Sequence, residues 1–74
     1  MTVYFYNKDE LKTALKNTSN NVVTVRFKTH KSIDITKPIL NNIRYFVKSD
    51  KKFMKTLISS ENNFILFLLK FINQ

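Results

Sequence analysis

The chain contains no cysteine, no glycine and no tryptophan, and only one proline. Without cysteine, neither a disulfide nor a cysteine-ligated zinc site can brace the fold, which favours the reducing cytoplasm. Loops that wrap the phosphates of a nucleotide need glycine, because a Cβ atom would keep the backbone away from the phosphate. The sequence therefore excludes the glycine-rich nucleotide-binding motifs.

Acidic residues and histidine are also scarce. The chain has five Asp and Glu residues, which are scattered, and His30, in a predicted turn between lysines, is its one histidine. Metal sites and catalytic groups need several such side chains in one place. We therefore expect no catalytic residue, no metal site and no cofactor, and we interpret the protein as a non-enzyme.

Positive charge is abundant instead. Thirteen Lys and Arg residues give the 74-residue chain a formal net charge of +8. This charge predicts an acidic partner, which could be nucleic acid, an anionic membrane or an acidic protein surface, although it could also serve solubility alone. Met1 to Tyr6 lacks the pattern of a secretory signal, and the most apolar run, Phe64 to Ile72, is too short to cross a bilayer. We expect no membrane span.

Hydrophobic periodicity predicts an α+β fold in a single domain, residues 1–74. Alternating side chains predict strands at 2–6, 22–28 and 33–35, of which the last two form a hairpin. Apolar spacings of three and four predict a helix at 8–17, a second one capped by Thr36, and a short one after Asp50. We expect a three-stranded sheet with helices packed on one face.

The C-terminal tail, Phe64 to Ile72, is apolar on every side, so both a helix and a buried strand fit it. Ser60 and Glu61 favour a helix, because they are typical of a helix start. Such a helix would project eight large apolar side chains in all directions, and a small sheet covers only one side of the helix. We therefore expect the tail to form a homodimer interface, and a dimer would carry twice the +8 of one chain.

The densest positive charge lies at Lys48, Lys51, Lys52 and Lys55, which we call the basic cluster. It is a candidate surface for binding an acidic partner, and the alternative is a solvated helix face.

A second candidate surface lies on the predicted sheet. Tyr4 and Tyr6 alternate with buried residues of the first strand, as Arg26 and Lys28 do on the second. If the two strands are neighbours, two rings and two cations share one exposed face, which suits base stacking and contact with a nucleic-acid backbone. Nucleic-acid binding is therefore the alternative function.

Residues 63–67, Asn-Phe-Ile-Leu-Phe, resemble the pentapeptide with which bacterial proteins engage the replication sliding clamp, Gln-Leu-Ser-Leu-Phe. Leu66 and Phe67 match its apolar anchors, whereas Asn63 replaces Gln and Phe64 replaces Leu. The alternative is that these residues belong to the core or to the dimer interface.

The short, cysteine-free, Lys-, Asn- and Ile-rich chain is also similar to early host-takeover proteins of AT-rich Gram-positive phages, and in size and character to the sliding-clamp inhibitors of Twort-like staphylococcal phages. This resemblance implies a protein in the cytoplasm of an infected bacterium that binds the host clamp. It would block the DNA channel or the peptide pocket of the clamp, and so stop host DNA replication. A mimic of DNA would be acidic, so this basic chain would have to block sterically or use acidic patches on the clamp.

Overall fold

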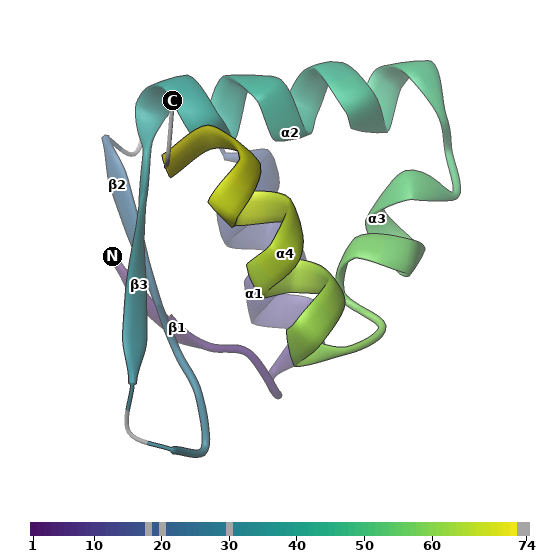
Figure 1. Cartoon of the computed structure of the whole chain (residues 1–74). Coiled ribbons are helices and arrows are strands. Elements are labelled where there is room, and N and C mark those ends of the chain that lie inside the picture. The colour runs from purple at the N-terminus through teal and green to yellow at the C-terminus, as the bar shows by residue number, and fades with distance from the viewer. Residues whose placement is uncertain (18, 20, 30, 73–74) are drawn as a thin grey trace.

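The structure is a computed structural model of the whole chain, and it describes residues 1–17, 19, 21–29 and 31–72. His30, in the predicted turn, lies outside the described residues. The elements follow one another as β1 (Thr2–Tyr4), α1 (Lys8–Lys16), β2 (Val22–Arg26), β3 (Ser32–Thr36), α2 (Lys37–Ser49), α3 (Phe53–Leu57) and α4 (Glu61–Ile72) (Figure 1).

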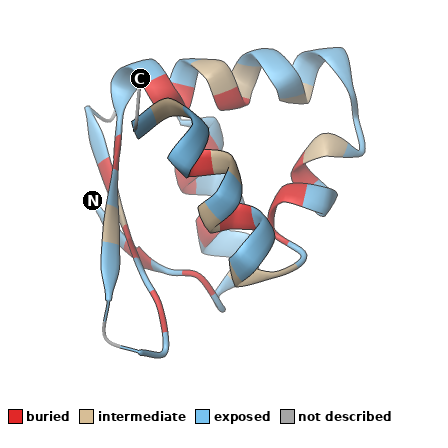
Figure 2. Cartoon of the chain, viewed as in Figure 1, coloured by how far each residue is buried: buried red, intermediate tan, exposed pale blue. Residues whose placement is uncertain are grey.

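The three strands form one mixed sheet in the order β1-β2-β3. β2 and β3 make the predicted antiparallel hairpin, and β1 pairs in parallel with β2. Parallel neighbours need a crossover connection, which α1 provides. The inward side chains Val3, Val23, Val25 and Ile35 are buried, and the helices lie on that side of the sheet (Figures 1 and 2). The predicted α+β fold, with helices on one face of a three-stranded sheet, is confirmed.

Two strands are shorter than predicted. β1 ends at Tyr4, because the Asn7 amide donates to the Tyr4 carbonyl at 3.1 Å and turns the chain toward α1. β2 ends at Arg26, one residue before the hairpin is closed by the Phe27 amide, which donates to the Lys31 carbonyl at 3.0 Å. The sequence predicted Tyr6 and Lys28 within the strands. In the structure both residues lie beyond the strand ends.

The helix starts follow from local hydrogen bonds. The Asn7 side chain accepts from the Glu10 amide and so caps α1, and its amide group donates to the Glu10 carboxylate at 2.8 Å. Thr36 occupies the predicted capping position of α2, but its side chain makes no capping hydrogen bond. The Ser60 hydroxyl accepts from the Asn63 amide at 3.1 Å and caps α4. The tail, for which helix and strand both fitted the sequence, is a helix.

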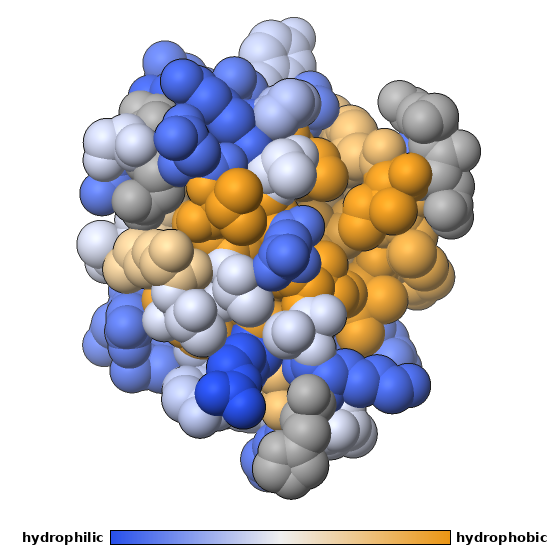
Figure 3. Space-filling model, turned by 90° about the vertical axis from the view of Figure 1, so that its left-hand side faces the viewer, coloured by the Kyte–Doolittle hydropathy of each residue, from blue (hydrophilic) through white to orange (hydrophobic). Residues whose placement is uncertain are grey.

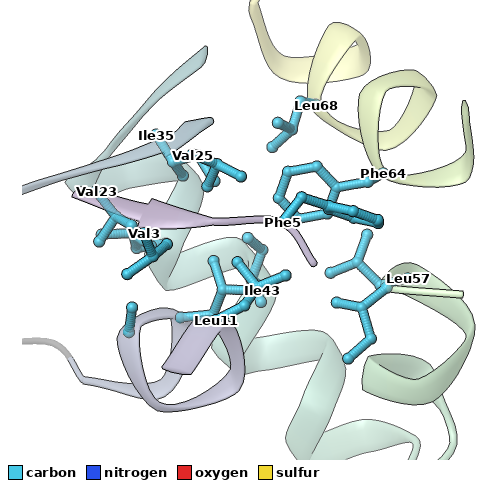
Figure 4. Close-up of a cluster of buried hydrophobic side chains, with 14 of the residues drawn as sticks. Val3, Phe5, Leu11, Val23, Val25, Ile35, Ile43, Leu57, Phe64 and Leu68 are labelled. Carbon is cyan, nitrogen blue, oxygen red and sulfur yellow. The ribbon is translucent and has the colours of Figure 1, made fainter. Parts of the chain in front are cut away.

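Three phenylalanines form the centre of the core. The ring centroids of Phe5 and Phe64 lie 5.4 Å apart, those of Phe5 and Phe27 5.6 Å, and those of Phe27 and Phe64 6.1 Å. They join the residue after β1, the residue after β2 and the first turn of α4, and Figure 4 shows Phe5 beside Phe64. All three rings are buried, and Leu11 and Leu57 belong to the same buried cluster.

Candidate functional site

The face of the sheet opposite the helices is the first candidate surface. We call it the open face, since no helix in the described part of the chain covers it (Figure 1). Thr2, Tyr4, Arg26 and Asp34 point outward from it and are exposed. Figure 3 shows that hydrophilic side chains dominate its upper and lower ends, whereas apolar surface lies near its centre and along one side.

The four residues predicted for nucleic-acid binding form two ring–cation pairs, of which Tyr4 and Arg26 lie on the open face and Tyr6 and Lys28 lie beyond the strand ends. Tyr4 and Arg26 are direct partners in the β1–β2 register, and the Arg26 guanidinium lies 5.5 Å from the centroid of the Tyr4 ring. Lys28 Nζ lies 4.8 Å from the centroid of the Tyr6 ring. Both tyrosines are about half exposed, at 56% and 46%. Each ring can therefore offer surface to a partner while a cation stands beside it.

Carboxylates share this region. The Tyr6 hydroxyl donates a hydrogen bond to Glu61 at the start of α4. That hydrogen bond, with smaller effects of desolvation and of the Glu61 charge, raises the pKa of Tyr6 above its usual value. On the strands, Thr24 donates to Asp34 at 2.7 Å. Glu61 and Asp34 lower the positive potential that a phosphate backbone would meet.

Lys8 links Tyr6 to the core. Its Nζ lies 3.4 Å from the centroid of the Phe5 ring and donates to the Ile58 carbonyl at 2.7 Å. Desolvation in this position lowers the pKa of Lys8, and the charge of Glu61 partly offsets that effect. Lys8 thus belongs to the fold rather than to a free basic surface.

A second candidate surface is a row of aromatic rings across α2, α3 and α4. We call it the aromatic row, and its members are Tyr45, Phe46, Phe53, Phe67 and Phe71. The centroids of consecutive rings lie 5.0–5.7 Å apart, and the ring of Phe46 also lies 6.0 Å from that of Phe67. Tyr45 is 67% exposed and Phe46 38% exposed, while the others are half buried. The row is therefore a partly open apolar surface.

The apolar spacing that predicts α2 and α3 counts Phe46 and Phe53 among the inward-facing residues, so it does not reveal the row. One signal was available in the neighbouring pair Tyr45 and Phe46. Adjacent helix positions point about 100° apart, so two large rings in sequence cannot both face one core.

The basic cluster borders this row. Lys48 is near the end of α2, Lys51 and Lys52 form the turn that follows, and Lys55 is in α3. All four are exposed, and none forms an ion pair with another described residue. Asp50, the acid in the turn, instead accepts a hydrogen bond from the Lys52 amide at 2.9 Å. The cluster is therefore free to meet a negatively charged partner.

The candidate clamp anchor, Asn63, Phe64, Leu66 and Phe67, does not form one exposed strip. Phe64 is fully buried at 0%, whereas Leu66 is 61% exposed on the outer side of α4. Phe67 is half buried in the aromatic row, and Asn63 is exposed. For Phe64 this favours the alternative that it belongs to the core, because a ring packed between Phe5 and Phe27 is not available to a clamp or to a dimer partner.

The tail is covered more fully than the sequence suggested. The sheet, α2 and α3 bury Phe64 and Leu68 and partly cover Ile65, Phe67 and Phe71. Leu66, Leu69 and Ile72 remain 61%, 40% and 48% exposed. The apolar surface left for a second copy is therefore the outer side of α4 only.

Within the described residues, no three His, Asp or Glu side chains gather into a group that could hold a metal ion. Nor is any helix there long and apolar enough to span a membrane. Comparison with known proteins finds no matching family model, no matching curated protein and no matching solved structure. The function is therefore argued from the surfaces of this chain.

Proposed function

We propose that this protein is a non-catalytic inhibitor that binds a host protein in the cytoplasm of an infected bacterium, and that its target is the sliding clamp of DNA replication. The observation that carries the proposal is the aromatic row beside the basic cluster. An exposed apolar surface rimmed by polar residues is typical of protein interfaces, whose centres are rich in aromatic rings. The lysines would form the rim and would draw the protein toward acidic patches on the target.

Of the two ways to block a clamp, the structure favours occupation of the DNA channel by the folded body. Insertion of the tail into the peptide pocket would require Phe64 to leave the core, and a buried phenylalanine contributes several kcal/mol to stability, about 3–5 for Phe→Ala. The body can bind through the aromatic row without unfolding. It would then exclude DNA sterically, which requires no resemblance of its charge to that of DNA.

Calorimetry with a purified staphylococcal clamp tests this proposal. We expect a complex at micromolar concentrations that a pocket-binding peptide does not displace and that prevents the loading of DNA. Tyr45→Ala should weaken it, because Tyr45 is the most exposed ring of the row. Tyr4→Ala, on the open face, is the matched control and should leave the affinity unchanged. Absence of heat and of a complex at these concentrations would exclude the clamp.

Nucleic-acid binding is a second candidate, and two ring–cation pairs favour it, Tyr4 with Arg26 on the open face and Tyr6 with Lys28 beyond the strand ends. If Tyr4 and Tyr6 stack on bases, alanine at either should cost about 1–3 kcal/mol for each stacked base. Titration of labelled single strands over a range of salt concentrations measures this cost, and here Tyr45→Ala becomes the control. Binding that is weak and indifferent to both tyrosines would reflect only the attraction of phosphates to the net charge.

We further propose that two copies pair through the outer side of α4. Leu66, Leu69 and Ile72 are the apolar side chains that the fold leaves exposed on this helix. A small core without disulfides gains stability from such pairing. A dimer would also offer two aromatic rows to the target.

A further inference from the structure

A small apolar pocket lies where α1, α2 and α3 meet. Leu15, Ile43 and Met54, one from each helix, are buried and form its floor, and the half-buried Val47 lines its wall. Its volume is about 140 Å³. An engineered apolar cavity of about 150 Å³ accepts benzene, so this pocket has room for one ring or one branched aliphatic group. It shares no residue with the aromatic row or with the open face.

Three cations surround the opening of this pocket. They are Lys16 at the end of α1, and Arg44 and Lys48 one turn apart on α2. No carboxylate lines the pocket, and none of the three cations forms a hydrogen bond or an ion pair with another described residue. Like charges one turn apart destabilise a helix, so helix stability does not account for the arrangement. The geometry suits a ligand that is apolar at its centre and negatively charged around it.

We propose that this pocket binds one large apolar side chain of a partner protein, within a segment whose neighbouring residues carry carboxylates. A free acid the size of the pocket would bring one carboxylate, whereas three separate cations can pair with several carboxylates spaced along a peptide. Arg44 is suited to the closest of these pairs, because the residue is half buried and a guanidinium can donate two parallel hydrogen bonds to one carboxylate. A second copy of this chain fits poorly, since it would bring the same cations to the opening. The inference shares with the proposed function a protein partner and the use of Lys48, and it does not depend on the clamp.

The test uses the full chain and a blocked acidic pentapeptide, Asp-Glu-Phe-Glu-Asp, at low salt. The methyl resonance of Met54 reports on the floor of the pocket, so we expect it to shift and to saturate as the peptide is added. Arg44→Gln should weaken binding by at least about tenfold, because it removes the charge-assisted hydrogen bonds to the carboxylate. Lys12→Gln is the matched control, because Lys12 is exposed on α1 and does not line the pocket, and it should change the affinity much less.

Further variants of peptide and protein separate the pocket from general charge attraction. Replacing the central Phe of the peptide by Ala should abolish the Met54 shift, as should Val47→Phe, which fills the pocket from its wall. Thermal unfolding of each protein variant verifies that it is folded.

The proposal is overturned if the Ala peptide binds equally well, if Lys12→Gln weakens binding as much as Arg44→Gln, or if the Met54 resonance does not shift. It is also overturned if free 3-phenylpropionate binds as tightly as the peptide, since one carboxylate would then suffice. Peptide binding without clamp binding would support this pocket while removing the clamp as the target.

Discussion

Replacing Phe64 by Leu tests whether α4 is part of the core or a segment offered to a partner. The substitution keeps an apolar side chain but removes the ring that packs against Phe5 at 5.4 Å and against Phe27 at 6.1 Å. An aromatic pair contributes about 0.5–1.5 kcal/mol beyond its buried area, so losing two pairs should cost about 1–3 kcal/mol. Phe64→Ala would be too severe, because it costs about 3–5 kcal/mol and a core of this size supplies little more.

Thermal unfolding followed by far-ultraviolet circular dichroism measures this cost. The melting temperature should fall by about 4–8 °C for each kcal/mol lost in a domain of this length. Asn62→Ala is the matched control, because Asn62 lies two residues earlier on the same helix and is exposed, and it should change stability by no more than about 0.5 kcal/mol. Equal losses in the two variants, or an unchanged midpoint for Phe64→Leu, would refute the placement of Phe64 in the core.

Three further predictions concern charge, pH and assembly. Reversing Lys51 and Lys55 to Glu should slow association with an acidic partner and flatten its salt dependence, as stopped-flow kinetics at several ionic strengths would show; unchanged rates would mean that the cluster is only solvated. The pKa of Tyr6 is raised in the folded chain, so its protonated hydroxyl stabilises the fold. This stabilisation is complete when the pH is below about 10, the pKa of tyrosine in the unfolded chain, and it is lost as the pH rises through the pKa of Tyr6 in the folded chain. Glu61→Ala should lower the pKa of Tyr6 in an NMR titration of labelled tyrosine, and an unchanged pKa would contradict the hydrogen bond. Light scattering should give the mass of a dimer that Leu69→Asp converts to a monomer, and a monomeric parent chain would remove the pairing proposal.

Local patterns in the sequence were sufficient for most elements of the fold. The alternation of Val23 and Val25 defines the inward face of β2, and the spacing of Asn7 and Glu10 is typical of a helix start. These features depend on neighbours in sequence, so they could be predicted without knowledge of the tertiary packing. The exact strand ends could not, because they depend on cross-strand partners such as the pair Phe27 and Lys31.

The candidate surfaces were predictable only where a single periodicity defines them. Tyr4 and Arg26 could be placed on one face from alternation, provided that β1 lies beside β2, and the structure places it there. The pocket between α1, α2 and α3 had no signal in the sequence, because Lys16 and Arg44 lie far apart along the chain and meet only when the helices pack. The side of α4 that carries Phe64 was likewise undetermined, since a run that is apolar all round has no preferred face.

The three central phenylalanines also constrain how the chain opens and closes. Their segments lie near the start, in the middle and near the far end of the described chain, so the core cannot form from any continuous stretch. Contacts between segments far apart in the sequence require long loops to close, which slows folding relative to a helical bundle of the same length. Conversely, any fluctuation that lifts α4 away exposes all three rings at once, so the buried amides of α4 should exchange with solvent only when the whole domain unfolds.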